Sequence, residues 1–532
     1  MLVYSFQTYD FYSVGLPWTT QNYVDLVTAG SYAKLFVKTL IIAVLVTLGA
    51  LVLGSPFAYY ISRVAGRRLA VFLLLVTVLP LWMNVVIRNY SWIALITNNG
   101  VLNTVLQAIG LPKLDIIYTL NIVIVVGITL ALPFAVLVLY ATMGNISNEV
   151  EEASLDLGSN RLRTFLKVIF PLSASGYQTA TLLIFMPTLA FYVTPIMLGG
   201  TEGAMVATAL MPVVRDVLDF AQGGAYIVPI VAILMLMVFL LRRGINIDNL
   251  YRSGVGSNVA RHTQRRSIWL LAYVIVILAI SYLPLFSMVL FSFGKNSSAV
   301  FPMQGGTLHW YRDLFSSGSM LLALKFSIIV AIETAIVSLM LCAPAAYAVV
   351  RHRFPGRGAY LFISLLPMLI PEIILGLAIL VLLITTGVPL SLQTVVLGHV
   401  TLALPFVFLT ILAQQYGFDR SIEEASKDLG ATPLMTFIKV VLPLMVPALI
   451  AGAFLAITIS FNDFVVAFIL TSGESTLPLY IFGLQKAGTS PSSNALGTLI
   501  IVGVVLVLLI VLIRPWDMVI RRVNKARATF GS

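Results

Sequence analysis

The chain has 532 residues, of which 59% are hydrophobic and only 10% are charged, and its formal net charge is +11. A soluble domain has about 25% charged residues, so this composition excludes a secreted or nucleic-acid-binding protein and indicates an integral membrane protein. Its many apolar runs of about 20 residues favour transmembrane helices over a β-barrel, whose strands are shorter and alternate. The basic residues cluster in alternate loops, so the positive-inside rule accounts for the net charge.

The hydropathy pattern predicts an all-α protein with about 11 membrane spans, an external N-terminus and a cytoplasmic C-terminus. Residues 1–34 are mixed polar and aromatic and lack the layout of a signal peptide. Segment 69–96 is interrupted by Pro80, Asn84 and Arg88, so we expect a span followed by a partly buried or re-entrant piece. The predicted spans are 36–62, 69–96, 117–143, 173–198, 226–241, 268–292, 326–350, 359–384, 395–416, 445–470 and 496–513.

A basic stretch divides the chain in two. Residues 242–267 combine six arginines with glycine and serine, which is typical of a flexible cytoplasmic linker. We place the domain boundary here, with a first half at 1–241 and a second half at 268–532. A membrane-surface segment that binds lipid is compatible with the same composition.

The two halves repeat one another. Residues 129–134 (Thr-Leu-Ala-Leu-Pro-Phe) recur 272 residues later as 401–406. Matching positions lie on the same side of the membrane, so the repeat is parallel and implies a pseudo-twofold axis along the membrane normal, with a solute path between the halves. Span 268–292 has no counterpart in the first half, so we expect that a first span is missing there. Pairs near the start of each half are 288 residues apart: Tyr23 and Tyr311, Tyr59 and Tyr347, and Arg63 and Arg351.

Two polar segments of one pattern, residues 150–171 and 422–443, interrupt the apolar sequence. They read Glu-Glu-Ala-Ser-Leu-Asp-Leu-Gly up to Gly158 and Glu-Glu-Ala-Ser-Lys-Asp-Leu-Gly up to Gly430. Acids favour the first turn of a helix, and glycine tolerates the positive φ of a helix end. After each glycine, apolar residues recur at i, i+3, i+4, i+7 and i+8. Each segment therefore predicts two short amphipathic helices around a glycine, on the cytoplasmic side.

These segments resemble the EAA loop of ABC-importer permeases, which has Glu-Ala-Ala/Ser, a glycine a few residues later and an end like Leu-Pro. In that family the loop forms the coupling helix that docks on the ATPase subunit. The resemblance implies type I importer transmembrane domains in a bacterial inner membrane, two copies of a cytoplasmic ABC ATPase and an extracytoplasmic solute-binding protein. The residues that it assigns to ATPase coupling are Glu152, Ala153, Gly158, Glu424, Ala425 and Gly430.

The sequence offers no catalytic or metal-binding pattern. The single cysteine, Cys342, lies in an apolar run, and the four histidines form no ligand cluster with it by spacing. A G-x-x-x-x-G-K-[ST] loop is also lacking. We therefore expect that the chain is not an enzyme and holds no metal or cofactor, and that ATP and Mg are bound by the separate ATPase.

Nearly the whole chain resembles the permeases of spermidine/putrescine importers, as if two subunits that are usually separate were fused. The second half carries Trp-Tyr-Arg-Asp-Leu at 310–314 and Ser-Phe-Asn-Asp at 460–463, and the first half carries Pro-Leu-Trp-Met-Asn-Val-Val-Ile-Arg at 80–88. The family often has two adjacent acids where this chain has Asn462 and Asp463, which weakens the polyamine assignment. Related permeases carry phosphonates, iron, sulfate, thiamine or opines, so these solutes stay open.

Charged groups inside spans are costly and usually functional, so we expect them along the solute path. A cation would pair with acids or aromatic faces, whereas Arg88 would suit an anion. The alternatives are structural hydrogen bonds for the acids, interfacial packing for the aromatic residues, and an ion pair with Glu372 for Arg88. The candidates are Asp463, where a span meets its external end, Asn462, Glu333, Glu372, Tyr192, Trp92 and Arg88.

The sequence thus predicts the permease of an ATP-driven importer for polyamines or a related small cation, with a binding protein that delivers the solute to external loops 199–224, 293–324 and 471–494. A secondary transporter driven by an ion gradient is one alternative, but it needs no pair of matched cytoplasmic segments. A membrane scaffold or receptor is another, and the charged groups inside the spans argue against it.

Overall fold

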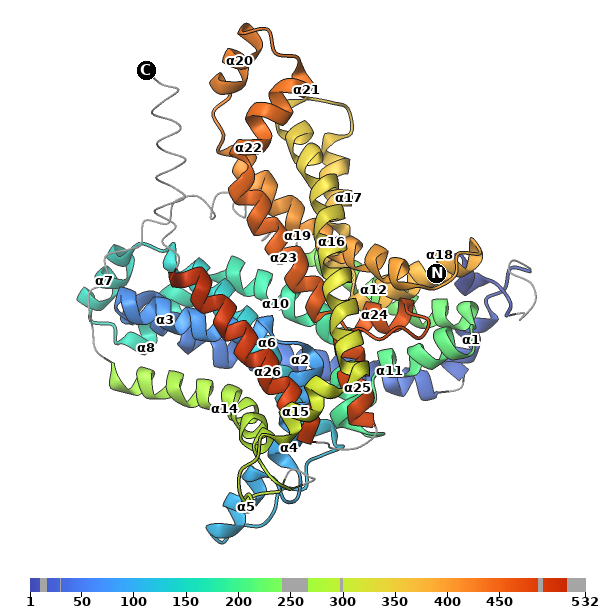
Figure 1. Ribbon diagram of the computed structural model, residues 1–532. Coiled ribbons are helices and arrows are strands. Elements are labelled where there is room, and N and C mark those ends of the chain that lie inside the picture. The colour runs from blue at the N-terminus through green and yellow to red at the C-terminus, as the bar shows by residue number, and fades with distance from the viewer. Residues whose placement is uncertain (10–16, 29, 242–266, 297–299, 487–490, 514–532) are drawn as a thin grey trace.

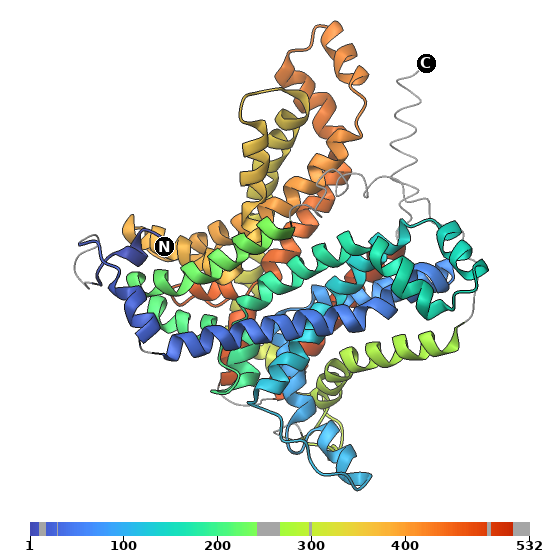
Figure 2. The same cartoon turned by 180° about the vertical axis from the view of Figure 1, so that it is seen from behind.

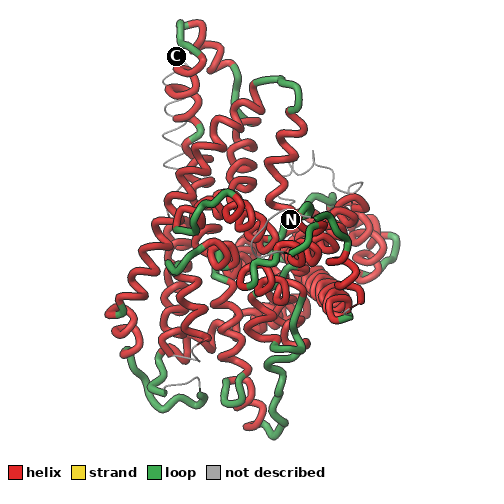
Figure 3. The backbone as a smooth tube through the Cα atoms, turned by 90° about the vertical axis from the view of Figure 1, so that its right-hand side faces the viewer, coloured by secondary structure: helices red, strands yellow, loops and turns green. Residues whose placement is uncertain are grey.

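The computed structural model describes residues 1–9, 17–28, 30–241, 267–296, 300–486 and 491–513. Within these ranges the chain is helical, and its β pairing is limited to two isolated bridges, Gln7–Trp18 and Gly294–Gly306. Figure 3 shows helices joined by loops throughout. The predicted all-α fold is therefore confirmed, while the predicted linker at 242–267 lies outside the described residues except for Ser267.

Each predicted span coincides with a helix or with a bent pair of helices. In the described ranges, six helices are long and apolar enough to cross a membrane alone, and four bent pairs raise the number to ten if each pair is one span. The six helices are α2 with its last turn η2 (Ser31–Val64), α6 (Leu120–Gly144), α12 (Phe220–Leu241), α14 (Ile268–Ser292), α16 (Gly318–Arg351) and α19 (Leu392–Tyr416). The other spanning segments are α3 (Arg67–Val78) with α4 (Val85–Ile96), α10 (Ala174–Leu189), α17 (Arg357–Leu369) with α18 (Glu372–Thr385), α23 (Val446–Asn462), and the shorter apolar helix α26 (Pro491–Ile513).

Each half is built around three helices packed side by side, α2, α6 and α10 in the first and α16, α19 and α23 in the second. Close approach within the first bundle depends on Gly54 of α2, because a Cβ there would lie 2.9 Å from the Cβ of Ala135 on α6. In Figures 1 and 2 the two bundles form arms that diverge from a shared centre. The polar segments lie at the free ends of the arms, as α7 (Asn148–Asp156) with α8 (Arg161–Thr164) and as α20 (Ser421–Asp428) with α21 (Pro433–Thr436).

Helix α14 interlocks the halves. It belongs to the second half by sequence, but it packs against α4 and α2 of the first half as well as against α26. Its Tyr273 Oη donates a hydrogen bond to Leu53 O (2.8 Å), and its Tyr282 Oη donates to Val76 O. Any movement of one half against the other must therefore carry α14 along or slide it past α4.

Matching local structures make the internal repeat visible. Tyr23 Oη donates to Ser5 Oγ at 2.7 Å, and Tyr311 Oη lies 2.7 Å from Ser292 Oγ. The chain bends by 99° between α3 and α4 and by 107° between α17 and α18. The residues directly before α4 and α18, Asn84 and Pro371, share φ −55° and ψ 138°. Proline within each first helix or just after it removes a backbone donor and favours such a break. The two parallel halves predicted from the sequence are therefore confirmed.

Candidate functional site

The first polar segment folds into two short helices around a glycine, as predicted. Gly158 follows α7 with φ +82°, a conformation that favours glycine. Asn160 caps α8, because its Oδ1 accepts the amide hydrogen of Arg163 (2.8 Å). Ser154 Oγ and Thr164 Oγ1 lie 3.0 Å apart and join the two helices.

The second polar segment repeats this geometry. Gly430 has φ +84°, and Thr432 caps α21 by accepting the amide hydrogen of Met435 (3.3 Å). Ser426 Oγ and Thr436 Oγ1 lie 3.2 Å apart, as their counterparts do in the first segment. The sequence pattern therefore encodes a shape as well as a composition.

The start of α20 carries a charged group that its counterpart lacks. Asp419 Oδ1 accepts the amide hydrogen of Ser421 (3.0 Å), and hydrogen bonds from the Ser421 backbone and side chain lower the pKa of this exposed carboxyl. The carboxylate therefore stays ionised where the helix dipole favours negative charge. One residue later, Arg420 Nε pairs with Glu424 Oε1 (3.0 Å) on the exposed side.

The outer faces of both polar segments are free and partly apolar. All six residues predicted to couple to an ATPase are exposed. Beside them, Leu157 is 88% exposed and Leu429 is 90% exposed, at equivalent places before the two glycines. Exposed leucines rimmed by charges are typical of a protein interaction site.

The inner faces are held by residues that sequence reasoning missed. Glu151 Oε1 accepts a hydrogen bond from Tyr59 Oη of α2 (2.7 Å), and Glu423 Oε2 accepts one from Tyr347 Oη of α16 (3.0 Å). Glu423 also forms an ion pair with Arg351 Nε (2.6 Å). The first acid of each Glu-Glu pair thus ties its segment to the membrane helix that opens each bundle. The signal was present in the repeat, which matches both tyrosines and the arginines that follow them.

Asp463 is buried and follows the last residue of α23, at the break between α23 and α24 (Val465–Leu470), so it lies at the end of a candidate span and is followed by a further buried helix. Its Oδ2 accepts the amide hydrogen of Ala467 (2.9 Å) and lies 3.0 Å from His399 Nε2. His399 Nδ1 lies 2.8 Å from Ser460 Oγ. The three side chains are buried, so the carboxylate is fixed from two sides.

Asn462 joins the two halves next to this acid. Its Nδ2 donates to Trp82 O (3.1 Å), and Asn84 Nδ2 donates to Asn462 O (2.6 Å). Two hydrogen bonds therefore connect the break between α23 and α24 in the second half to the break between α3 and α4 in the first half.

Glu372 is the first residue of α18, directly after the 107° bend. It is exposed, forms no hydrogen bond or ion pair with any described residue, and interacts electrostatically with Asp463. Glu333, in the middle of α16, is half-buried and likewise has no hydrogen-bond or ion-pair partner among the described residues. The structural hydrogen bonds considered for these two acids are not formed.

Tyr192 is buried at a contact between the halves. Its ring stacks on that of Phe468 in α24, with the centroids 6.1 Å apart. Arg215 of the first half lies over the same phenylalanine, with Cζ 3.9 Å from the ring centroid. The aromatic faces near Asp463 thus already hold a cation that belongs to the protein.

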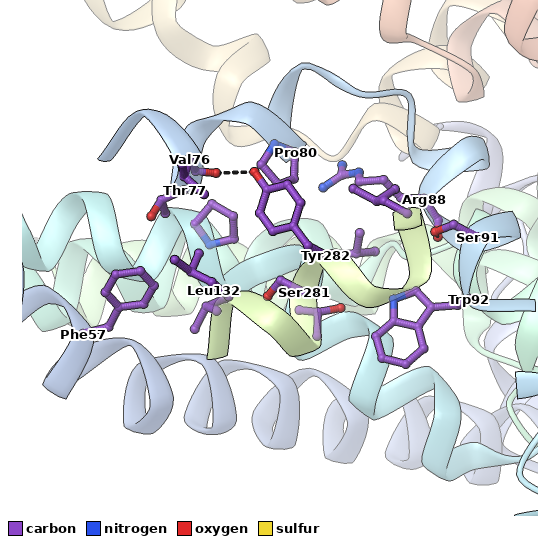
Figure 4. Close-up of a pocket in the computed structure, with 15 residues that line it drawn as sticks. Phe57, Val76, Thr77, Pro80, Arg88, Ser91, Trp92, Leu132, Ser281 and Tyr282 are labelled. Carbon is purple, nitrogen blue, oxygen red and sulfur yellow. Dashed lines mark hydrogen bonds between the residues drawn. The ribbon is translucent and has the colours of Figure 1, made fainter. Parts of the chain in front are cut away.

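Arg88 and Trp92 line a different space. Figure 4 shows them on α4, entering a cavity closed on another side by Ser281 and Tyr282 of α14. Arg88 forms no ion pair with Glu372, and its guanidinium donates no hydrogen bond to a described residue. The alternative of an ion pair across the halves is therefore wrong. Among the described residues there is also no cluster of three or more histidines, cysteines or acids that could hold a metal ion.

The chain is similar to a family of membrane transport proteins over most of its length. The family model for the binding-protein-dependent transport system inner membrane component matches residues 50–247 and again 338–525. The spermidine/putrescine permease PotC of Haemophilus influenzae is 35% identical over 43% of this chain and 90% of its own length. The putrescine permease PotI of Escherichia coli K12 is 36% identical over 45% of this chain and 89% of its own length, and the spermidine/putrescine permease PotB of the same strain is 28% identical over 44% and 86%.

Among solved structures, a bacterial ABC transporter that imports the acidic polysaccharide alginate matches 46% of this chain and 92% of its own, with 18% identity and a TM-score of 0.36. The family model matches twice, and each of the permease relatives covers less than half of this chain but most of itself, so the chain holds two permease units. Such permeases work with an ATPase and a solute-binding protein, in the inner membrane. The two family matches cover most of the sequence, and the chain belongs to the family of binding-protein-dependent transport system inner membrane components.

Proposed function

We propose that this chain serves as the membrane permease of an ATP-driven polyamine importer, with two fused permease units divided at 242–267. The names of its relatives support the solute class. The observation that carries the proposal is Glu372, a carboxylate without a hydrogen-bond or ion-pair partner among the described residues and close enough to Asp463 to interact with it. An alkylammonium group would supply the missing positive charge.

Asp463 and Glu372 would have different roles in binding the solute. Asp463 is fixed by His399 and a backbone amide, so it offers a charge in a constant position. Glu372 has no such restraint and can turn towards a passing cation. Because a charged group inside a span is costly without a counter-charge, a solute that pairs with both acids would be bound most strongly between the exposed Glu372 and the buried Asp463. Tyr192 would line the path beside Phe468, whose ring already lies under Arg215, and Asn462 would link the site to the hydrogen bonds between the halves.

The polar segments would couple this path to ATP. Two copies of a cytoplasmic ATPase would grip them, with Leu157 and Leu429 in its grooves and Glu152 and Glu424 against basic side chains at their rims. Gly158 and Gly430 would set the turns that present these residues. The bonds from Glu151 and Glu423 to the membrane helices would carry movement into the arms. This arrangement requires both segments and the C-terminus on the cytoplasmic side, and ATP hydrolysis would occur in the ATPase alone.

Reconstitution in liposomes with the ATPase and the binding protein tests the proposal. Putrescine or spermidine should stimulate ATP hydrolysis and be taken up. Glu372→Gln should raise the KM for putrescine about tenfold, which corresponds to about 1.4 kcal/mol of lost binding. Asp115→Asn, which changes an exposed acid of the loop before α6, outside the loops expected to receive the solute, is the matched control and should leave uptake unchanged. Normal KM in the Glu372 variant would remove the acid pair from the path.

A second candidate is an importer of another small solute. It is favoured by the single acid at 462–463, where polyamine permeases often have two. Stimulation of ATP hydrolysis by a small anion alone would select this candidate and leave the coupling role of the polar segments intact.

A further inference from the structure

The cavity beside Arg88 contains a positive charge that the proposed polyamine path does not use. The cavity has about 480 Å³ of atom-free space, including its open mouth, and lies between α4 and α6 of the first half and α14 of the second. We infer that it is a binding site for a small inorganic anion of the chloride class, held between Arg88 and α14.

The unsatisfied groups in the cavity are hydrogen-bond donors. Arg88 Nε is buried and has no hydrogen-bond partner. Trp92 stands one turn further along α4, and its indole N–H forms no hydrogen bond with a described residue. A guanidinium and an indole N–H can only donate, so what they lack is an acceptor.

The hydroxyl groups of the cavity wall cannot serve as further donors, because each gives its hydrogen to a backbone carbonyl. Ser91 Oγ donates to Arg88 O (2.7 Å), Ser281 Oγ to Ile277 O (3.0 Å) and Tyr282 Oη to Val76 O. Their oxygen atoms can still accept, so water molecules could complete the shell of an ion there.

The charge of the wall selects an anion over a neutral ligand. Of the fifteen residues that line the cavity, Arg88 is charged and none is acidic. An arginine at membrane depth normally pairs with an acid, with backbone carbonyls or with water, because an unpaired charge there is costly. Since no described side chain balances Arg88, a mobile anion is the group that can neutralise it.

Bound there, the anion would act on both halves. It would link α4, which carries Arg88, to α14 of the second half through water molecules that donate to the oxygen atoms of Ser281 and Tyr282. It would also screen Arg88 from cations near Asn84 and Asn462, one turn away along α4. The inference does not depend on the proposed solute, because the anion binds the permease itself.

The test uses the purified full chain in lipid nanodiscs, without ATPase, binding protein or polyamine. Thermal unfolding is compared in sodium chloride and in sodium gluconate at equal ionic strength. The wild-type protein should unfold several degrees lower in gluconate, because a ligand that binds only the folded state stabilises it. Arg88→Gln should unfold at the same temperature in both salts. Arg312→Gln, which removes an exposed external arginine, should behave like the wild type.

A wild-type protein indifferent to the exchange, or an Arg88→Gln variant that keeps the full chloride effect, would overturn the inference. If Arg88→Gln does not fold, crystals of the wild-type protein grown in bromide decide the matter. An anomalous bromide peak within hydrogen-bonding distance of the Arg88 guanidinium supports the site, and a cavity without one refutes it.

Discussion

The two polar segments have the same backbone conformation, but different side-chain contacts hold them to the membrane helices. In both, a tyrosine of the first bundle helix donates to the first glutamate, and an arginine one turn later donates to a backbone carbonyl, Ile146 O in one half and Phe418 O in the other. The second arginine, Arg351, also forms a buried ion pair with Glu423. The first, Arg63, instead donates to Asn148 Oδ1 and to a second carbonyl.

The cause of the difference lies in one position of the repeat. Asn148 supplies a neutral acceptor that faces inward, whereas its counterpart Arg420 turns outward and pairs with Glu424. Because no amide oxygen is available there, Arg351 pairs with the Glu423 carboxylate instead. The comparison teaches that the geometry of a coupling segment can be kept while the charge that holds it changes, so the two segments need not respond alike to a pull from the ATPase.

The largest expected effect follows from breaking the ion pair. Glu423→Ala leaves the Arg351 guanidinium buried without a counter-charge, at 12% side-chain exposure, and should destabilise the second arm by about 3–5 kcal/mol. Glu151→Ala removes one hydrogen bond from Tyr59 and should cost about 1 kcal/mol. Thermal unfolding of the two variants in the same lipid measures the difference. Equal losses would mean that the two anchors are energetically the same.

Local sequence was sufficient to predict the shape of these segments. The glycines at 158 and 430, the acids in the first turns and the caps at Asn160 and Thr432 act over a few residues, so their roles follow from spacing alone. The partners of Glu151 and Glu423 lie 92 and 72 residues away along the chain. Local sequence patterns cannot predict contacts between residues so far apart in the chain. Only the comparison of the two halves marked the tyrosines and arginines as equivalent.

The membrane-embedded candidates show where sequence reasoning stops. The cost of charge in a membrane was enough to select Asp463, Glu372 and Arg88. Which of them meet depends on two helix breaks, because the break after Asn462 turns Asp463 towards His399 while α4 turns Arg88 into a separate cavity. His399 carried no signal, since a single histidine in an apolar run is more often structural than functional.

A second test of how the two polar segments differ is to replace the exposed leucine before each glycine, Leu157 or Leu429. Leu157→Asp and Leu429→Asp should each weaken binding of the ATPase roughly 30-fold, because burial of a leucine contributes about 2 kcal/mol. If the more strongly anchored segment carries more of the load, the Leu429 variant should lose more transport. Leu308→Asp, which changes another exposed leucine (67% exposed) in the loop before α15 (His309–Ser316), is the control. ATPase binding by immobilised permease measures all three, and unchanged affinity in both the Leu157 and the Leu429 variant would remove the leucines from the interface.

A third change tests the neutral anchor. Asn148→Ala takes one acceptor from Arg63 but leaves the carbonyls of Met143 and Ile146, so the first arm should lose about 1.5 kcal/mol. Asn148→Asp should restore the loss and give the first segment an ion pair like that of the second. Unfolding temperatures of the two variants decide this, and a further loss in the aspartate variant would show that the first arm does not accept a charge.

The smallest effect on stability should come with a large effect on function. Glu424 is 59% exposed and its ion pair with Arg420 is a surface pair, so Glu424→Arg should change the free energy of unfolding by no more than about 1 kcal/mol. If the ATPase groove carries a basic side chain opposite this acid, the variant repels it, and ATP hydrolysis proceeds without transport while the permease stays in the membrane. Glu152→Arg gives the same test in the first half. Because Glu152 has no ion-pair partner among the described residues, its variant separates repulsion by the ATPase from loss of the Arg420 pair. Normal uptake in both variants would place the docking contacts elsewhere on the polar segments.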